Sequence, residues 1–393
     1  YTKHTQISRK EYEIQPPNLP RKSFPALSTN DYAYLNSGGS GPPTHKTILA
    51  MRETDDLCSG PAYLQGAQFY VRQGEAYSRA REAVANLIGS LPEDVALTQS
   101  TTHGMNLGVS SLNWESGDEV ISTTTEHPGC LAPLHALQDR FGVKLTLISP
   151  PVTVEKIKEA LTPETRLIAL SHVDWTTGEV LPLAEICALA REHGALTLVD
   201  GAQSVGNIPV DAPATGADMY AFTGHKWLLG PEGMGALYVH PECRAYSPNL
   251  GYLSIADPKS FNREGNYELH PGARRFESST MSPALAGGFS NALKAATERG
   301  EAGLKEIHRR AELLMDLLSE NPRIKLRTPR PARTGLVSFE VERVSSKEVA
   351  EKLLEQRFVV RFIPEPNHYV RASVHLFNTE EELEALARAV TNL

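Results

Sequence analysis

A lysine lies where a buried strand is expected to end. The apolar run MYAF, residues 219–222, leads directly into Thr223, His225 and Lys226. A lysine at such a place often extends its ammonium group into water along an apolar stem. The alternative is an amine held in a pocket to do covalent chemistry. The other polar residues of the chain indicate which of these two interpretations of the lysine applies.

Polar side chains follow five consecutive apolar runs of the chain. In an open α/β sheet, ligands bind beyond the carboxyl ends of the strands, so these side chains are candidates for one site. The five clusters are residues 100–104 (STTHG), 126–129 (EHPG), 171–175 (SHVDW), 200–203 (DGAQ) and 223–226 (TGHK). Each alone has a structural explanation, such as a helix N-cap for Thr102 or a turn for Asp200. Because caps do not require His, Lys and Gln, we expect the five clusters to converge on one pocket.

This combination of groups fits pyridoxal 5'-phosphate. The aldehyde of this cofactor needs an amine, which Lys226 supplies, and its ring nitrogen accepts electrons only while a buried carboxylate such as Asp200 keeps it protonated. Its phosphate needs backbone N–H groups at a helix start together with hydroxyls, and residues 100–106 offer both. His127 provides a face on which a flat ring can stack. The glycine-rich residues 37–41 lack the GK[ST] that a nucleotide-binding loop requires.

The stretches around these clusters predict the elements that position them. Short β-rich apolar runs alternate with stretches of helical spacing at 74–89, 154–161 and 182–193, and residues 230–237 form a turn into a last strand. Such alternation is typical of a mostly parallel sheet covered on both faces. After residue 280, two consecutive helices and a βαββα pattern predict a smaller α+β domain. We therefore predict an N-terminal arm at 1–30 that packs with the small domain, a large cofactor-binding domain at 31–280 and the small domain at 281–393.

Composition excludes several other classes of protein. The formal net charge of −8 disfavours nucleic acid or an anionic membrane as the partner, and no apolar run approaches the length of a membrane helix, about 18 residues. The cysteines, Cys58, Cys130, Cys187 and Cys243, form no CxxC pair, and the histidines form no HExxH pair, so no metal site is expected. The polar start of the sequence lacks the apolar core of a secretory signal. We therefore expect a cytoplasmic protein with reduced thiols.

Two blocks carry a family resemblance. The stretches LVDGAQSVGNIPVD (198–211) and YAFTGHKWLLGPEGMGALYVH (220–240) resemble the class V aminotransferase family, in the cysteine desulfurase branch of the fold-type-I pyridoxal enzymes. The resemblance extends from YLNSGG (34–39) to YVRASVHLFNTEEELEAL (369–386). It implies the fold-type-I transferase architecture, with a mostly parallel seven-stranded sheet in the large domain.

The resemblance also implies a role for each matched residue. Lys226 would bond the cofactor's aldehyde covalently, and Asp200 would pair with the ring nitrogen. Gln203 would contact the phenolate oxygen, and His127 would stack on the ring. The residues expected at the phosphate are Thr101, Thr102, Thr223 and His225, with Thr280 supplied by a neighbouring subunit. This last assignment implies a homodimer with shared active sites. The expected catalytic residues are Lys226, Asp200 and His127.

The substrate side of the site departs from the desulfurase pattern. Arg371 matches the arginine that binds the substrate carboxylate, and Gly39 and Arg361 are also expected there. Desulfurases carry a catalytic cysteine in the stretch that corresponds to residues 359–373, which hold none. They also carry an asparagine where this chain has Trp175, which either walls the substrate pocket or is a core aromatic. Both departures are similar to the cystine (cysteine) C–S lyases of the same branch.

These observations predict a pyridoxal-dependent lyase of sulfur amino acids. β-Elimination would release persulfide from cystine or sulfide from cysteine, with pyruvate and ammonia as the other products. The alternatives are a desulfurase that uses another thiol and yields alanine, an aminotransferase or epimerase on the same scaffold, and a non-catalytic scaffold in sulfur transfer. A sulfur acceptor protein is a further possible partner.

Overall fold

A seven-stranded sheet forms the centre of the larger part of the molecule. The computed structural model describes residues 18–364 and 367–393. The strands are β2 (Val95–Thr98), β3 (Glu119–Thr123), β4 (Lys144–Ile148), β5 (Thr165–Ser171), β6 (Leu196–Asp200), β7 (Met219–Thr223) and β8 (Gly235–Val239). Their order is β2-β8-β7-β6-β5-β3-β4, and the neighbouring pairs are parallel except for the two that include β8. The predicted mostly parallel α/β sheet is confirmed.

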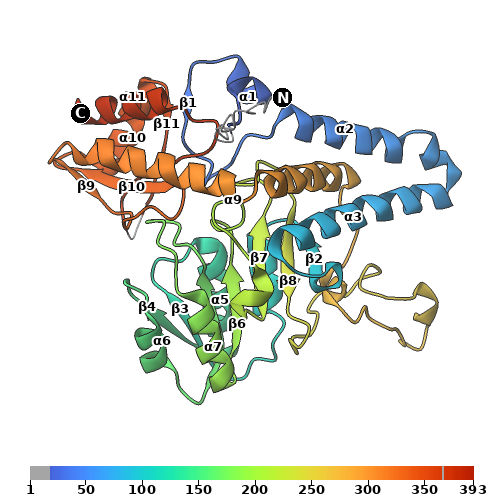
Figure 1. Cartoon of the computed structure of the whole chain (residues 1–393). Helices are drawn as coiled ribbons and strands as arrows, with labels where there is room; N and C mark the ends of the chain where they lie inside the picture. Colours follow the sequence, from blue (N-terminus) through green and yellow to red (C-terminus); the bar gives the residue numbers. More distant parts are fainter. Residues whose placement is uncertain (1–17, 365–366) are drawn as a thin grey trace, which may run out of the picture.

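Helices cover both faces of this sheet (Figure 1). In β7, Tyr220 and Phe222 belong to the core on one face, whereas Met219 and Ala221 belong to the core on the other. The helices on the Tyr220 face include α3 (Ala67–Ile88), α6 (Val154–Ala160), α7 (Leu183–His193) and α8 (Ala212–Thr215), together with the first half of the long helix described below. The helices on the opposite face are α4 (Thr101–Val109) and α5 (Pro128–Phe141). Burial on both faces explains why β7 is a continuous apolar run in the sequence.

The predicted helices agree with the structure in type and differ in length. The Thr153 hydroxyl caps α6 by accepting a hydrogen bond from the backbone N–H of Lys156. α7 ends at Gly194, whose φ of 84° is the left-handed conformation that glycine adopts at no steric cost. The stretch expected at 74–89 is the second part of α3, which starts earlier, at Ala67.

A long helix connects the central sheet to the C-terminal part of the chain. α9 (Pro283–Ser319) is interrupted at Gly300, with φ 51° and ψ −152°, so it consists of two helical halves, and the two consecutive helices expected there are confirmed. Before the break, α9 packs against α3 and α2 (His45–Ser59), which project together as a hairpin (Figure 1). After the break, it packs against β9 (Ile324–Leu326) and β10 (Leu336–Val341). The boundary near residue 280 stays a prediction.

The C-terminal part is a small sheet with two helices. The strands follow the order β12 (Arg361–Phe362), β13 (Val370–Ser373), β10 and β9, all antiparallel. The helices are α10 (Ser346–Glu355) and α11 (Glu380–Thr391). A second, two-stranded sheet pairs β1 (Ala33–Tyr34) with β11 (Phe358–Val359). The remaining short elements are η1 (Arg21–Ser23), α1 (Pro25–Ser28), η2 (Pro61–Gln65), η3 (Pro92–Asp94), η4 (Pro258–Ser260) and η5 (Ala273–Phe276).

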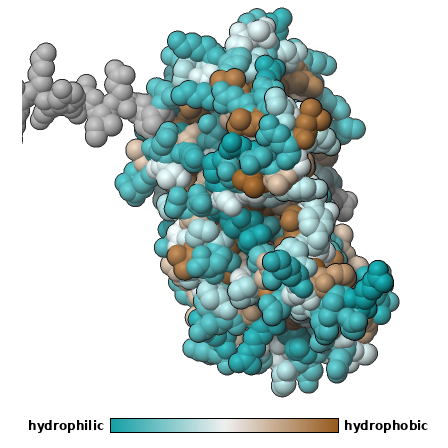
Figure 2. All heavy atoms as spheres, turned by 90° about the vertical axis from the view of Figure 1, so that its right-hand side faces the viewer, coloured by the Kyte–Doolittle hydropathy of each residue, from teal (hydrophilic) through white to brown (hydrophobic). Residues whose placement is uncertain are grey.

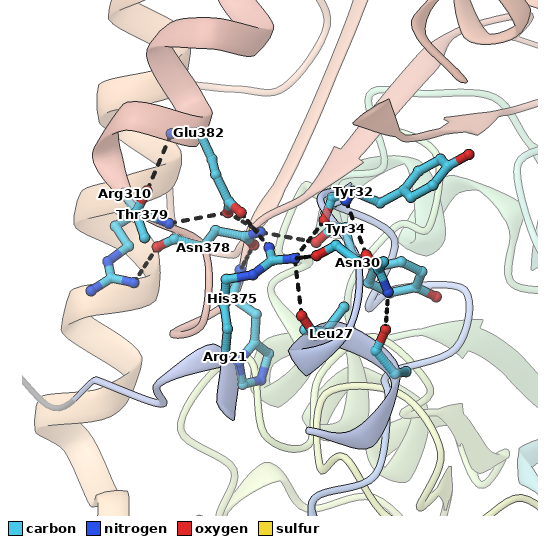
Figure 3. A network of polar contacts seen from close by, with 11 residues as sticks. Arg21, Leu27, Asn30, Tyr32, Tyr34, Arg310, His375, Asn378, Thr379 and Glu382 are labelled. Atoms are coloured by element: carbon cyan, nitrogen blue, oxygen red, sulfur yellow. Dashed lines mark hydrogen bonds and ion pairs between the residues drawn. The ribbon is translucent and has the colours of Figure 1, made fainter. Parts of the chain in front are cut away.

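The first described residues of the chain pack against α11, the last helix of the C-terminal part. Arg21 forms an ion pair with Glu382 in the first turn of α11, and it also donates to the carbonyl oxygen of Tyr32 at 2.9 Å (Figure 3). The side-chain amide of Asn378 donates to the carbonyl oxygen of Tyr34 at 2.9 Å. Residues 1–17 of the predicted arm lie outside the described residues. Among the helices that the structure describes, none has the length and apolar character needed to cross a membrane.

Candidate active site

Lys226 and Asp200 lie close together at the carboxyl ends of β6 and β7, and we call the residues around them the candidate pocket. Asp200 is the last residue of β6, and Lys226 follows β7 by three residues. Burial, together with the charges of Arg371 and Arg361, lowers the pKa of the Lys226 amine to about 8, although Asp200 opposes the shift. Burial raises the pKa of the Asp200 carboxyl, and Lys226 opposes that shift. The structure therefore brings together the amine and the carboxylate that the sequence singled out.

The glycine-rich loop at residues 37–41 packs against the backbone of the segment that contains Lys226. The backbone N–H of Gly41 donates to the carbonyl oxygen of His225 at 2.6 Å. A Cβ atom on Gly41 would lie 2.2 Å from the carbonyl oxygen of Lys226, so only glycine permits this approach. Gly39, predicted on the substrate side, lies in the same loop against the side chain of Asn36. The role of residues 37–41 is thus close backbone packing beside Lys226.

His127 and Trp175 form an aromatic wall of the pocket. Their ring centroids are 5.1 Å apart, and the planes cross at 84°. His127 is the N-cap of α5, where Nδ1 accepts from the backbone N–H of Gly129 at 3.0 Å. Burial, with the positive charges of Lys226 and the arginines, lowers the pKa of His127 to about 4. His127 is therefore neutral near pH 7.

A carboxylate-centred turn fixes the position of Trp175. One oxygen of Asp174 accepts from the backbone N–H groups of Thr176 at 2.8 Å and Thr177 at 2.7 Å. The other oxygen accepts from the hydroxyl of Thr125 at 2.6 Å. The indole Nε1 of Trp175 donates to the carbonyl oxygen of Thr125 at 2.7 Å. Trp175 is thus a buried side chain whose position is fixed at both its backbone and its ring.

Two arginines from the small sheet lie over the same indole. Arg361 in β12 and Arg371 in β13 are direct partners in the antiparallel pairing. Their guanidinium carbons lie 5.8 Å and 5.9 Å from the Trp175 ring centroid. Arg371 is fully buried, and its Nε and Nη2 atoms have no hydrogen-bond partner among the residues described. Burial and Arg361 together lower the pKa of Arg371 to about 9, although the carboxylate of Asp174 opposes the shift.

The first turn of α4 offers a cradle for a second anion. Ser100 caps the helix, with Oγ accepting from the backbone N–H of His103 at 3.1 Å. The hydroxyl oxygen of Thr101 is buried without a partner in the described part of the chain. Thr102 follows it and lies against Gly129, where any Cβ atom would be 2.4 Å from the Thr102 hydroxyl. A helix start with free N–H groups and an unpaired hydroxyl suits a phosphate.

The other predicted phosphate residues divide into two groups. Thr223 and His225 lie together, with the Thr223 hydroxyl 2.8 Å from Nδ1 of His225, beside the Lys226 segment. Thr280 is different: its side chain is exposed and hydrogen-bonds to the hydroxyl of Tyr252. Among the residues that the structure describes, Thr280 therefore has no hydrogen bond with the phosphate residues of its own chain. The sequence analysis predicted it at the phosphate of a neighbouring subunit, and this stays a prediction.

Gln203 connects the lysine segment to the glycine loop. Its Nε2 donates to the carbonyl oxygen of Gly38 at 2.8 Å, and its Oε1 accepts from the indole N–H of Trp227 at 2.8 Å. Both contacts fix the amide in one orientation. One N–H of Nε2 remains for an oxygen in the pocket, which is the contact predicted for this residue.

The sequence did not single out a role for Glu126. Its carboxyl group is buried, accepts from the backbone N–H of Ser171 at 2.9 Å, and lies close enough to Asp200 to feel its charge. Burial raises the pKa of Glu126 to about 8, in spite of the hydrogen bonds from Ser171. The only signal was its place directly before His127 in the 126–129 cluster.

No cysteine reaches the pocket as a reactive thiol. All four cysteines are buried, and burial raises the pKa of each of them. Residues 359–373 contain no cysteine. Groups of three or more His, Cys, Asp or Glu that could hold a metal ion are absent from the described residues.

Known proteins match the chain over nearly its whole length. The family model described as aminotransferase class-V matches residues 33–386. A probable cysteine desulfurase of Halalkalibacterium halodurans is 30% identical, with 94% of this chain and 96% of the relative covered. The structure of the cystine C–S lyase C-DES with its reaction product cysteine persulfide is 31% identical, has a TM-score of 0.85 and covers 94% of this chain and 99% of that one. A C-DES mutant with glycine covalently linked to the PLP cofactor is similar at a TM-score of 0.86, with 31% identity and 95% and 100% of the two chains covered.

Proposed function

Since the chain belongs to the class-V aminotransferase family, we propose that it is a carbon–sulfur lyase that performs β-elimination on cystine or cysteine. It is a pyridoxal-phosphate-dependent enzyme. The products are pyruvate and ammonia, together with persulfide from cystine or sulfide from cysteine.

The residues present fit the cofactor. The unpaired hydroxyl of Thr101 at the start of α4 would receive its phosphate together with Thr102, the next residue of the same helix. Thr223 and His225, which bond to each other beside Lys226, are the other residues that we propose for the phosphate. Asp200 is placed to pair with the ring nitrogen, and Lys226 to bond the aldehyde. When bound, pyridoxal 5'-phosphate supplies an electron sink that stabilises negative charge at the α-carbon of an amino acid.

The protein's own groups bind the substrate and move its proton. The unpaired Nε and Nη2 of Arg371 are available to hold the α-carboxylate in two parallel hydrogen bonds. Nζ of Lys226, with a pKa of about 8, takes the α-proton as a general base near neutral pH. The bond between the β-carbon and sulfur then breaks, and the sulfur leaves with the electron pair. The three-carbon fragment hydrolyses to pyruvate and ammonia.

The absence of a usable thiol is the observation that favours the lyase over a desulfurase. A desulfurase needs a thiolate that attacks the substrate sulfur, and a buried thiol with a raised pKa does not supply one. All four cysteines of this chain are of that buried kind, and none lies in residues 359–373. In β-elimination the sulfur departs as the leaving group when the bond to the β-carbon breaks, so no protein nucleophile has to attack it.

Arg361 favours cystine over cysteine as the substrate. Cystine carries two carboxylates, and the pocket carries two neighbouring arginines over one indole. Arg371 binds the first carboxylate, and Arg361 is placed for the second. Cysteine has no second carboxylate, so it would not gain the ion pair with Arg361 that cystine would form.

We also propose that the enzyme is a cytoplasmic homodimer. Large apolar side chains are exposed on the α2–α3 hairpin and on the segment at 247–272: Leu57, Tyr63, Leu64, Tyr70, Val71, Tyr252, Phe261 and Tyr267. Figure 2 shows hydrophobic groups among hydrophilic ones on the face that carries this hairpin. Patches of this kind mark protein contacts, and Thr280 would reach the partner's phosphate from this side. Light scattering that gives the mass of one chain would contradict the dimer. A sulfur acceptor protein is a further proposed partner.

Product analysis tests the reaction. The holoenzyme is incubated with cystine, and separately with cysteine, without added thiol. Pyruvate and ammonia in equal amounts support the lyase. Alanine in place of pyruvate contradicts it and supports the desulfurase. A colourless protein that takes up no cofactor would support the non-catalytic scaffold.

A further inference from the structure

A cavity lies beside the break in α9, away from the pocket that contains Lys226. Its volume is about 240 Å³. Its walls come from the end of α3, from residues 205–210, from both sides of Gly300 in α9, and from Leu376. Most of these walls are apolar, with Val205, Leu304 and Ile307 among them. We call it the hinge cavity, because the two halves of α9 meet there.

One cation lines the hinge cavity without an acidic partner. Arg299 has no hydrogen bond or ion pair in the part of the chain that the structure describes, although it is partly buried and lines the cavity. Its Cβ packs over Gly303, where an added methyl group would meet it at 3.0 Å. Burial lowers the pKa of Arg299 to about 10, and Glu298 opposes this shift only in part. A partly buried guanidinium that forms no ion pair is unfavourable, so an anion in the cavity would be stabilised.

The charged groups around Arg299 have partners elsewhere. Glu301 forms an ion pair with Lys305 at 3.2 Å, and Glu306 is bound by Arg310 at 2.7 Å. His375 is close enough for Arg299 to lower its pKa, which burial brings to about 3, so this imidazole is neutral. Of the acidic groups near Arg299, only the neighbouring Glu298 raises the pKa of Arg299, and it does not offset the effect of burial.

We propose that the hinge cavity binds a small monocarboxylate with an apolar body, whose carboxylate pairs with Arg299. Arginine presents two parallel donors that match a carboxylate. The volume is sufficient for an aromatic ring or a branched aliphatic group, since a cavity of about 150 Å³ already holds benzene. The apolar walls select against inorganic anions, which would lose their hydration there.

The hinge cavity shares a wall with the lysine segment of the active site. A Cβ atom on Gly206 would be 3.0 Å from the carbonyl carbon of Trp227, the residue after Lys226. His375 Nε2 donates to the carbonyl oxygen of Trp227 at 3.1 Å, and its ring stacks on the indole at 6.0 Å. Figure 3 shows His375 next to Asn378 and Arg310 at the small-sheet side. A ligand in the hinge cavity would therefore contact both halves of α9, and only Gly206 and its neighbours would separate it from Trp227, the residue after Lys226.

The test measures binding of 4-fluorobenzoate to the holoenzyme by fluorine NMR, with neutral 4-fluorobenzamide as the matched ligand. We expect 4-fluorobenzoate to bind at least about tenfold more tightly than the amide, since only the carboxylate can form charge-assisted hydrogen bonds with Arg299. Arg299→Gln should remove this preference. Lys294→Gln, on the exposed side of the same helix, should leave it intact.

Two further variants locate the site. Arg361→Gln should leave one binding event for 4-fluorobenzoate, because the hinge cavity is separate from the substrate pocket. Leu304→Phe extends a lining side chain into the cavity and should weaken binding even if Arg299→Gln does not fold. Unchanged binding in Arg299→Gln, equal binding of the amide, or loss of all binding in Arg361→Gln would overturn the proposal.

Discussion

Arg371 Nη1 donates a hydrogen bond of 2.6 Å to the carbonyl oxygen of Trp175. This contact joins the small sheet to the turn that follows β5. It fixes the guanidinium so that Nε and Nη2 remain for a carboxylate. The orientation of the substrate therefore depends on the Trp175 turn as well as on the arginine.

Shortening Trp175 should impair substrate binding more than turnover. In Trp175→Phe the ring wall remains, but the hydrogen bond from Nε1 to the carbonyl oxygen of Thr125 is lost, at about 1 kcal/mol. Trp175→Ala also removes the surface beneath both arginines, so we expect a larger rise in KM for cystine, about tenfold or more. Steady-state kinetics of both variants check this. A fall in kcat at unchanged KM would contradict the assigned role.

The two arginines should differ in their effect on the two substrates. Arg371→Gln should lower kcat/KM by about a hundredfold for cystine and for cysteine, because both lose the partner of the α-carboxylate. Arg361→Gln should raise KM for cystine and leave that for cysteine nearly unchanged. Arg323→Gln, on an exposed loop, is the control. Equal effects of Arg361→Gln on both substrates would refute the assignment of the second carboxylate.

The amine of Lys226 should react over an unusually low pH range. The rate at which the apoprotein bonds pyridoxal 5'-phosphate should rise with pH around a midpoint near 8, because the neutral amine is the nucleophile. Asp200 raises this pKa, so Asp200→Asn should shift the midpoint lower. Asp139→Asn, exposed on α5, should leave it unchanged. The pH–rate profile followed by absorbance decides the matter: a shift upward in Asp200→Asn is incompatible with the proposed pairing. Lys226→Ala should abolish turnover.

A buried ion pair should contribute strongly to stability. Nη2 of Arg81 lies 2.7 Å from the Glu277 carboxylate, which also accepts from the backbone N–H of Leu97 at 2.8 Å. Arg81→Met leaves this carboxylate buried and unpaired, and we expect a loss of about 3–5 kcal/mol. The comparable change at the surface, Arg79→Met, removes only an exposed pair with Glu75 and should cost about 0–1 kcal/mol. Urea unfolding at one protein concentration measures both. Equal costs would mean that the pair is not isolated from water.

Sequence patterns predicted the central sheet because its strands are short apolar runs bounded by turns. They predicted α3 only in part, since its first turns expose Tyr70 and Val71 and so lack the apolar spacing of a buried helix. The projecting helix α2 was not predicted, because few of its side chains are buried and its sequence therefore lacks a regular apolar spacing. Helices of this kind are stabilised by contacts that a local pattern does not contain.

The candidate site was predictable where each residue follows its own strand. Lys226, Asp200, His127 and Thr101 were found in this way. The contacts that fix the surrounding side chains, such as Trp175, could not be predicted, because these contacts join residues far apart in the sequence. The hydroxyl of Thr125 binds Asp174, 49 positions later, and no local spacing indicates that pair. The raised pKa of Glu126 likewise arises from burial that only the folded chain creates.

The most direct test of the central claim is turnover of cystine by a chain without cysteine. In this variant, Cys58, Cys130, Cys187 and Cys243 are all replaced by alanine, and circular dichroism and cofactor absorbance confirm folding and loading. Because elimination needs no protein thiol, we predict pyruvate and ammonia at a rate close to that of the unmodified enzyme. A folded, cofactor-loaded variant that forms no pyruvate, while the unmodified enzyme converts the substrate into alanine, would contradict the account.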